Sequence, residues 1–132
     1  MANYTQVNLN EVENQAPNFG LSEGMEARFA SGDLGLKQSG AGMLRLEPGF
    51  RVPFGHEHSE QEELYVVIRG SAKVKVGDEV LDLSEFDALR VDAGVMRNFE
   101  AGPDGVTYLA FGAPAVEDKQ AEADMQPGWW KD

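Results

Sequence analysis

The stretch from His56 to Gly70 constrains this chain more than any other. It reads His-Glu-His-Ser-Glu-Gln-Glu-Glu-Leu-Tyr-Val-Val-Ile-Arg-Gly, and it contains the only two histidines of the sequence. Residues two apart in an extended strand point to the same face, so both imidazoles can aim at one point. A turn through residues 59–62 would return Glu63 to that point on the next strand. Two histidines and one carboxylate are a sufficient set of ligands for a divalent transition metal.

Apolar and polar residues alternate along most of the chain, and turn residues interrupt this pattern at short intervals. Such a pattern predicts an all-β protein, either an antiparallel sandwich or a barrel. Gly77-Asp78 is a two-residue hairpin signal, and residues 102–105 predict another turn. Only residues 115–125 are expected to be helical. Strands are expected over residues 26–30, 36–38, 42–46, 51–58, 63–69, 72–76, 79–83, 88–91, 95–101 and 106–112.

Length, charge and composition limit the classes of function. A chain of 132 residues predicts one domain, with a core barrel over about 25–112, an N-terminal leader over 1–20 that is either loose or an edge strand, and a C-terminal tail over 113–132. The net charge of −12 argues against nucleic acid and anionic membrane surfaces as partners. There is no cysteine, no apolar segment long enough to span a membrane, and no signal-peptide pattern at the start. We therefore expect a cytoplasmic protein.

Strand parity places Arg97 on an inward face, like the histidines. An inward arginine needs a carboxylate or an anionic ligand, and its planar fork suits a carboxylate or a phosphate. Glu63 could be its counter-ion, or a bound acid could replace or supplement Glu63. Four aromatic residues could line the same cavity or simply pack in the core: Phe54, Tyr65, Phe99 and Tyr108.

The pattern His-x-His-x4-Glu-x6-Gly, which ends at Gly70, resembles the first sequence motif of the cupin superfamily. This resemblance covers about residues 40–112 and implies a small jelly-roll β-barrel. It also implies that His56, His58 and Glu63 are possible ligands of nickel, zinc, iron or manganese. The second cupin motif matches only at Gly94, and Arg97 occupies the position of its histidine. The resemblance therefore supplies no fourth protein ligand, and it leaves open that no metal is bound.

Three functions remain open, because cupins include enzymes of several classes, storage proteins and sensor domains. The first is a protein that binds a small, possibly anionic molecule in the barrel beside a weak or vestigial metal site. The second is a metal-dependent enzyme of dioxygenase or isomerase type. The third is a metal-free enzyme in which His56 or His58 carries a proton. A purely structural role for both histidines, hydrogen-bonded to Glu63 and water, is the alternative to a metal site.

A homodimer is the expected assembly. The strand over residues 63–69 carries apolar residues on both faces, and a strand of this kind usually has a second layer over it. The outward apolar residues are Leu64, Val66 and Ile68. The aromatic pair Trp129-Trp130 near the C-terminus either folds back on its own barrel, lids the cavity or crosses to a partner.

Overall fold

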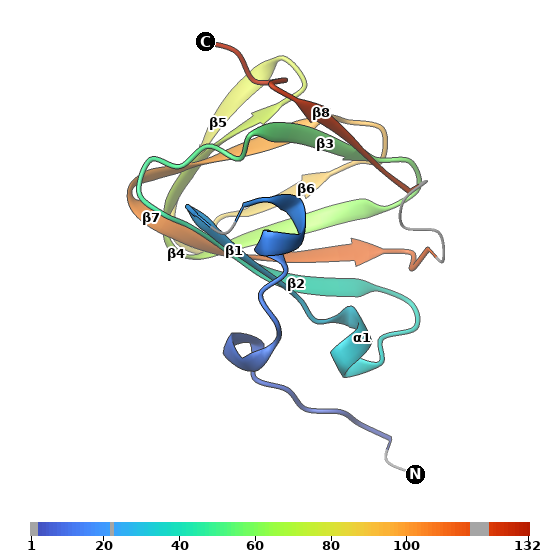
Figure 1. The fold of residues 1–132 in the computed structure, drawn as a ribbon. Coiled ribbons are helices and arrows are strands. Elements are labelled where there is room, and N and C mark those ends of the chain that lie inside the picture. The colour runs from blue at the N-terminus through green and yellow to red at the C-terminus, as the bar shows by residue number, and fades with distance from the viewer. Residues whose placement is uncertain (1–2, 22, 117–121) are drawn as a thin grey trace.

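The computed structural model describes residues 3–21, 23–116 and 122–132 of the chain. Within them, eight strands form one strongly curled antiparallel sheet (Figure 1), which confirms the predicted all-β jelly-roll barrel. The short helical segments include η1 (Leu9–Glu11), η2 (Ala16–Phe19) and α1 (Ser31–Leu34). The strands are β1 (Met25–Phe29), β2 (Gly40–Leu46), β3 (Phe54–His58), β4 (Glu62–Val76), β5 (Glu79–Leu83), β6 (Ala88–Val91), β7 (Arg97–Ala113) and β8 (Ala123–Pro127).

The two long strands, β4 and β7, run through both faces of the barrel. On one face, β7 from 106 to 112 lies between β2 and the first half of β4, with β1 and β6 outside them. On the other face, β7 from 97 to 101 lies between β3 and the second half of β4, with β8 and β5 outside them. The strands expected separately over 63–69 and 72–76, and over 95–101 and 106–112, are therefore two continuous strands.

Gly70 marks the point where this pair of strands bends from one face to the other. The pairing jumps there from Gly70 opposite Val106 to Ala72 opposite Ala101. Gly70 has φ +77°, and a Cβ at this position would lie 2.1 Å from the carbonyl oxygen of Gly105. Residues 102–105, expected to form a turn between two strands, instead lie within β7 as the extra residues of this irregular pairing.

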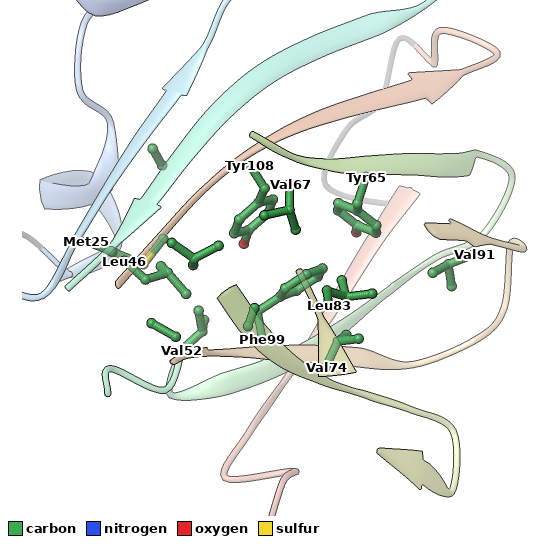
Figure 2. Packing of buried hydrophobic residues seen from close by; sticks show 14 of the residues in the cluster. Met25, Leu46, Val52, Tyr65, Val67, Val74, Leu83, Val91, Phe99 and Tyr108 are labelled. Atoms are coloured by element: carbon green, nitrogen blue, oxygen red, sulfur yellow. The ribbon is translucent and has the colours of Figure 1, made fainter. Parts of the chain in front are cut away.

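The core fills the space between the two faces, as Figure 2 shows. Alternation along β4 places Tyr65 and Val67 inward before the bend and Ala72 and Val74 inward after it, each at most 3 % exposed. Side chains from β1, β2, β5, β6 and β7 complete the cluster: Met25, Ala27, Leu46, Leu83, Val91, Phe99, Ala101, Val106 and Tyr108, together with Ala16 and Val52.

Three other local predictions were wrong. Residues 36–38 form no strand, because the chain turns through α1 and ends it at Gly35, whose φ of +69° suits glycine. Residues 51–53 precede β3, with Arg51 making only an isolated bridge to Glu100. The predicted helix over 115–125 covers residues 117–121, which lie outside the described part, while its last three residues belong to β8. That segment pairs with β3, and this contact overrides local helical preference.

The N-terminal leader is exposed at its described start, where Tyr4 is 80 % exposed, and packs on the barrel only from Val12 onward; its described residues do not pair as an edge strand. Val12 and Ala16 are 3 % and 0 % exposed, and the Asn14 side chain accepts hydrogen bonds from the backbone N–H groups of Ala16 and Ala27. No helix in the described ranges is long and apolar enough to cross a membrane.

Phe86 is the one non-glycine residue with positive φ in the described chain, at +68°, and its side chain is 78 % exposed. Replacing it with glycine removes roughly 1–2 kcal/mol of left-handed strain and adds roughly 0.5–1 kcal/mol of backbone entropy cost. We therefore expect Phe86→Gly to raise the free energy of unfolding by about 0.5–1 kcal/mol, measured by urea denaturation at an unchanged m-value.

Phe86→Ala is the matched control, because it removes the same exposed ring and keeps the Cβ atom that causes the strain. If both variants change stability equally, the conformation of Phe86 is not strained.

Candidate functional site

Strands β3 and β4 bring His56, His58 and Glu63 together at one end of the barrel. The Oε1 atom of Glu63 lies 3.0 Å from His58 Nε2 and 3.5 Å from His56 Nε2. One ligand atom from each residue lies within 4.8 Å of the others, so this cluster could hold a metal ion. Two imidazole nitrogens and one carboxylate oxygen are a donor set that suits zinc, iron, nickel or manganese.

Tyr65 supports Glu63 from the inner side of the cluster. Its hydroxyl donates a hydrogen bond to Glu63 Oε1 and lies 3.5 Å from His56 Nε2. Burial raises the pKa of Tyr65 well above its usual value, and the Glu63 charge acts in the same direction. Tyr65 therefore keeps its proton at neutral pH and remains a donor.

Glu63 is ionised and His56 is neutral in this arrangement. Burial raises the pKa of Glu63, but hydrogen bonds with His56, His58 and Tyr65 outweigh it and hold that pKa well below its usual range. Burial lowers the pKa of His56, the contact with Glu63 opposes this, and the nearby charge of Arg97 lowers it further. A neutral imidazole and an ionised carboxylate are the protonation states that ligate a metal.

Arg97 lies directly opposite His56 in the pairing of β3 with β7. Its side chain is 0 % exposed, and Nε, Nη1 and Nη2 are buried without a hydrogen-bond partner among the residues that the structure describes. Among the described residues, Arg97 forms no ion pair with Glu63, whose carboxylate contacts the histidines and Tyr65 instead. The alternative in which Glu63 is its counter-ion is therefore not what the structure contains.

The aromatic residues expected near the site form part of the core beneath it. The rings of Phe99 and Tyr108 stack with centroids 4.5 Å apart, and Tyr65 meets the edge of Phe99 at 4.8 Å (Figure 2). Phe54 is half-buried and packs against the same cluster. Their role in lining a ligand site stays a prediction.

Sequence reasoning missed Glu122, which is only 4 % exposed. Its carboxylate accepts hydrogen bonds from Ser59 Oγ at 2.8 Å, from Glu60 N at 2.9 Å and from Gln61 N at 2.8 Å. Its Oε1 also lies 3.3 Å from His58 Nδ1. Burial raises the pKa of Glu122, but these hydrogen bonds and the His58 ring lower it overall. No local pattern marks this residue, because its partners lie about 60 positions earlier in the chain.

The C-terminal tail packs on its own barrel. The Arg51 guanidinium lies over the Trp130 ring at 4.2 Å, and the Lys75 ammonium lies over Trp129 at 4.6 Å. A Cβ at Gly55 would lie 2.7 Å from the Trp129 ring, so glycine lets the tail approach β3. In this arrangement Trp129 covers β3 at Gly55, and Trp130 lies beside Arg51 just before that strand.

Two surface cavities lie away from the cluster. One, of about 250 Å³, is lined by Arg45, Arg69 and Asp104 and lies at the bend of β4 and β7 near Gly70. The other lies beside Lys37 and Asp92. Neither is lined by the three candidate ligands or by Arg97, so neither is the candidate site.

Comparisons with known proteins agree with this architecture. A family model described as "Cupin domain" matches residues 42–110. No curated protein sequence matches the chain. A cupin protein from Bacteroides fragilis superposes with a TM-score of 0.72 at 22% identity, covering 89% of both chains.

Oxalate decarboxylases share the fold as well. The Bacillus subtilis enzyme, which has Mn(II) centres, gives a TM-score of 0.74 at 20% identity over 96% of this chain. The Lactobacillus farciminis enzyme, in a formate complex, gives 0.76 at 16% identity, also over 96%. This chain spans 33% and 37% of those two chains. At these identities the likeness shows the fold alone.

Because Arg97 lies opposite His56, we expect its positive charge to weaken metal binding at the cluster. Arg97→His should lower the dissociation constant for Ni²⁺ or Zn²⁺ at least tenfold, about 1.4 kcal/mol, because it removes a positive charge and adds a third imidazole. Titration calorimetry at pH 7.5, where imidazoles are mostly neutral, measures this change.

Arg97→Met separates the two effects, since it removes the charge without adding a ligand. Arg97→His should bind more tightly than Arg97→Met. Equal affinity of the two variants, or tight stoichiometric metal in the wild type, would contradict the prediction.

Proposed function

The chain belongs to the cupin family, and from this premise we propose that it binds a small anionic molecule in the barrel, beside a weak divalent-metal site at His56, His58 and Glu63. The observation that carries this proposal is the guanidinium of Arg97, which is fully buried and whose three nitrogens have no hydrogen-bond partner in the described part of the chain.

A buried, unpaired guanidinium destabilises the folded state, because the charge loses its hydration without gaining hydrogen bonds. Folded proteins rarely keep such a group unless something else satisfies it. A carboxylate would accept two parallel N–H bonds from the planar fork of Arg97 and cancel its charge. The formate complex of the Lactobacillus farciminis oxalate decarboxylase supports a carboxylate as the ligand class.

His56, His58 and Glu63 would hold the metal, and Tyr65 would keep the Glu63 carboxylate oriented through its hydrogen bond. A bound divalent metal acts as a Lewis acid toward an oxygen ligand. Manganese is one candidate, because the Bacillus subtilis oxalate decarboxylase, which shares the fold, has Mn(II) centres. Arg97 would oppose a metal there: if the guanidinium lay about 5 Å from a dication, the two would repel by roughly 7 kcal/mol at an effective dielectric of 20. This is the reason for a weak site.

A metal-dependent enzyme of dioxygenase or isomerase type is the second candidate. It is favoured by the three clustered donors of His56, His58 and Glu63, which would leave positions on a bound metal free for a substrate. Conversion of a carboxylate by the metal-loaded protein would select this candidate over binding alone.

Replacing Arg97 tests the anion site directly. Arg97→Met should raise the free energy of unfolding of the ligand-free protein by about 1–3 kcal/mol, because it removes a buried unsatisfied group. The same variant should lose the thermal stabilisation that formate or oxalate gives the wild type. Melting temperatures, with and without each salt, measure both effects.

Sodium chloride at matched ionic strength is the control for non-specific salt effects. A wild type that formate, oxalate and phosphate all leave unchanged, or a variant that they stabilise equally, would contradict the anion site. If phosphate stabilises the wild type and formate and oxalate do not, the anion site is supported, but its ligand is a phosphate rather than a carboxylate.

We also propose that two copies of this chain associate through the outer face of β4 and β7. Leu64 and Phe111 lie opposite each other in this pairing and are 41% and 39% exposed, and Ile68 is 36% exposed. Half-buried Val66 and Leu109 continue the apolar surface between them. A contiguous apolar face of this kind is typical of an interface. A second copy has the same apolar surface, so a two-fold symmetric interface would pack this surface of one copy against the same surface of the other.

Leu64→Asp should convert the dimer to a monomer, measured by analytical ultracentrifugation at micromolar concentration. Val80→Asp is the matched control, because Val80 is 50% exposed on β5, on the other face of the barrel. Each chain carries a net charge of −12, so added salt should strengthen association of the wild type by screening repulsion. A monomeric wild type at all salt concentrations would refute the dimer.

A further inference from the structure

We propose that Glu122 is a positioning residue for His58, which orients the ring through Nδ1 and fixes the loop that joins the two ligand-bearing strands. The inference rests on the proposed metal site, because it concerns how one candidate ligand is held there. It adds a role for the C-terminal segment, which the pattern around the histidines does not include.

The ring of His58 lies between two carboxylates. Its Nε2 faces Glu63 Oε1 at 3.0 Å, and its Nδ1 faces Glu122 Oε1 at 3.3 Å. A histidine that binds a metal through one nitrogen usually donates its other N–H to a carboxylate or carbonyl, which sets the ring orientation. Glu122 is placed to accept that bond from Nδ1.

The Nδ1 atom is buried and has no aligned hydrogen bond in the described structure. The Glu122 contact is slightly longer than the usual range for N–H···O bonds. A small rotation of the imidazole would align the pair. The inference is that Nε2 coordination holds the ring in the orientation that completes this bond.

Glu122 also holds the loop over residues 59–61 through both its backbone and its side chain. The Ser59 N–H donates to the Glu122 carbonyl at 2.7 Å, while Ser59 Oγ and the N–H groups of Glu60 and Gln61 donate to the carboxylate. This loop leads from His58 to Glu63. Fixing it limits how far the two ligands can move apart, so one residue governs both ring orientation and ligand spacing.

The competing explanation is that Glu122 only stabilises the loop over residues 59–61, and this explanation predicts a different result. A cap that does not act on His58 would affect stability and leave the imidazole unchanged. Metal affinity and the state of the His58 ring therefore distinguish the two roles.

The experiment compares Glu122→Ala, Glu122→Gln and the wild type. Glu122→Ala should weaken Zn²⁺ binding by about 10–100-fold, and Glu122→Gln by less, because its amide oxygen can still accept the Nδ1 proton. Glu60→Gln is the matched control: it removes one exposed negative charge from the same loop without touching His58. It should leave zinc affinity within about twofold.

Nitrogen-15 NMR gives the second readout, and it is simple because the chain has two histidines. In the zinc-loaded wild type, the His58 Nδ1 proton should be shifted downfield and exchange slowly with water. In Glu122→Ala this proton should exchange faster and lose the downfield shift. In metal-free protein at pH 9, where ordinary imidazoles are neutral, the ring proton should move toward Nε2 in Glu122→Ala.

Unchanged zinc affinity and unchanged imidazole signals in both Glu122 variants would overturn the inference, whatever happens to the melting temperature. If Glu122→Ala does not fold, the same comparison of Glu122→Gln with the wild type decides. If the wild type binds no zinc, the metal site fails. The metal-free spectra then still decide whether Glu122 controls the His58 ring.

Discussion

The pairing of β4 with β7 is the constraint on which the rest of this structure depends. The two strands stay together through a bend at Gly70, where a side chain would strike the backbone of Gly105. The same pair therefore builds both faces of the barrel and encloses one core. It also positions the candidate site. Glu63 lies at the start of β4 and Arg97 at the start of β7, and both lie next to the histidines of β3.

Much of this arrangement could be predicted from sequence because it depends on local periodicity. The two-residue spacing of His56 and His58 fixes their common face, and the alternation through Tyr65 and Val67 fixes which side of β4 is buried. The hairpin at Gly77-Asp78 is equally local, and its register, Val76 opposite Glu79, is the one a two-residue loop requires. These features need no knowledge of distant contacts.

The remaining features depend on contacts between distant segments. Residues 102–105 contain the glycine, proline and aspartate of a turn, yet they continue β7, because a long paired strand accommodates them as a bulge. Residues 123–125 have helical preference and form a strand, because β3 has an open edge. Glu122 belongs to the same class: its place beside His58 follows from that strand pairing and from nothing in its neighbourhood in sequence.

Charge couples the two halves of the proposed site. With His56 neutral, Glu63 and Arg97 contribute opposite unit charges to the buried interior, and Tyr65 contributes none. Adding a dication leaves a net positive interior, whereas adding a carboxylate alone leaves a negative charge beside Glu63. Each unit pair at about 5 Å is worth roughly 3 kcal/mol at an effective dielectric of 20. Metal and anion would therefore each bind more tightly when the other is present, and this coupling must be the same in both directions. A dicarboxylate, with two charges to set against the dication, would gain most from it.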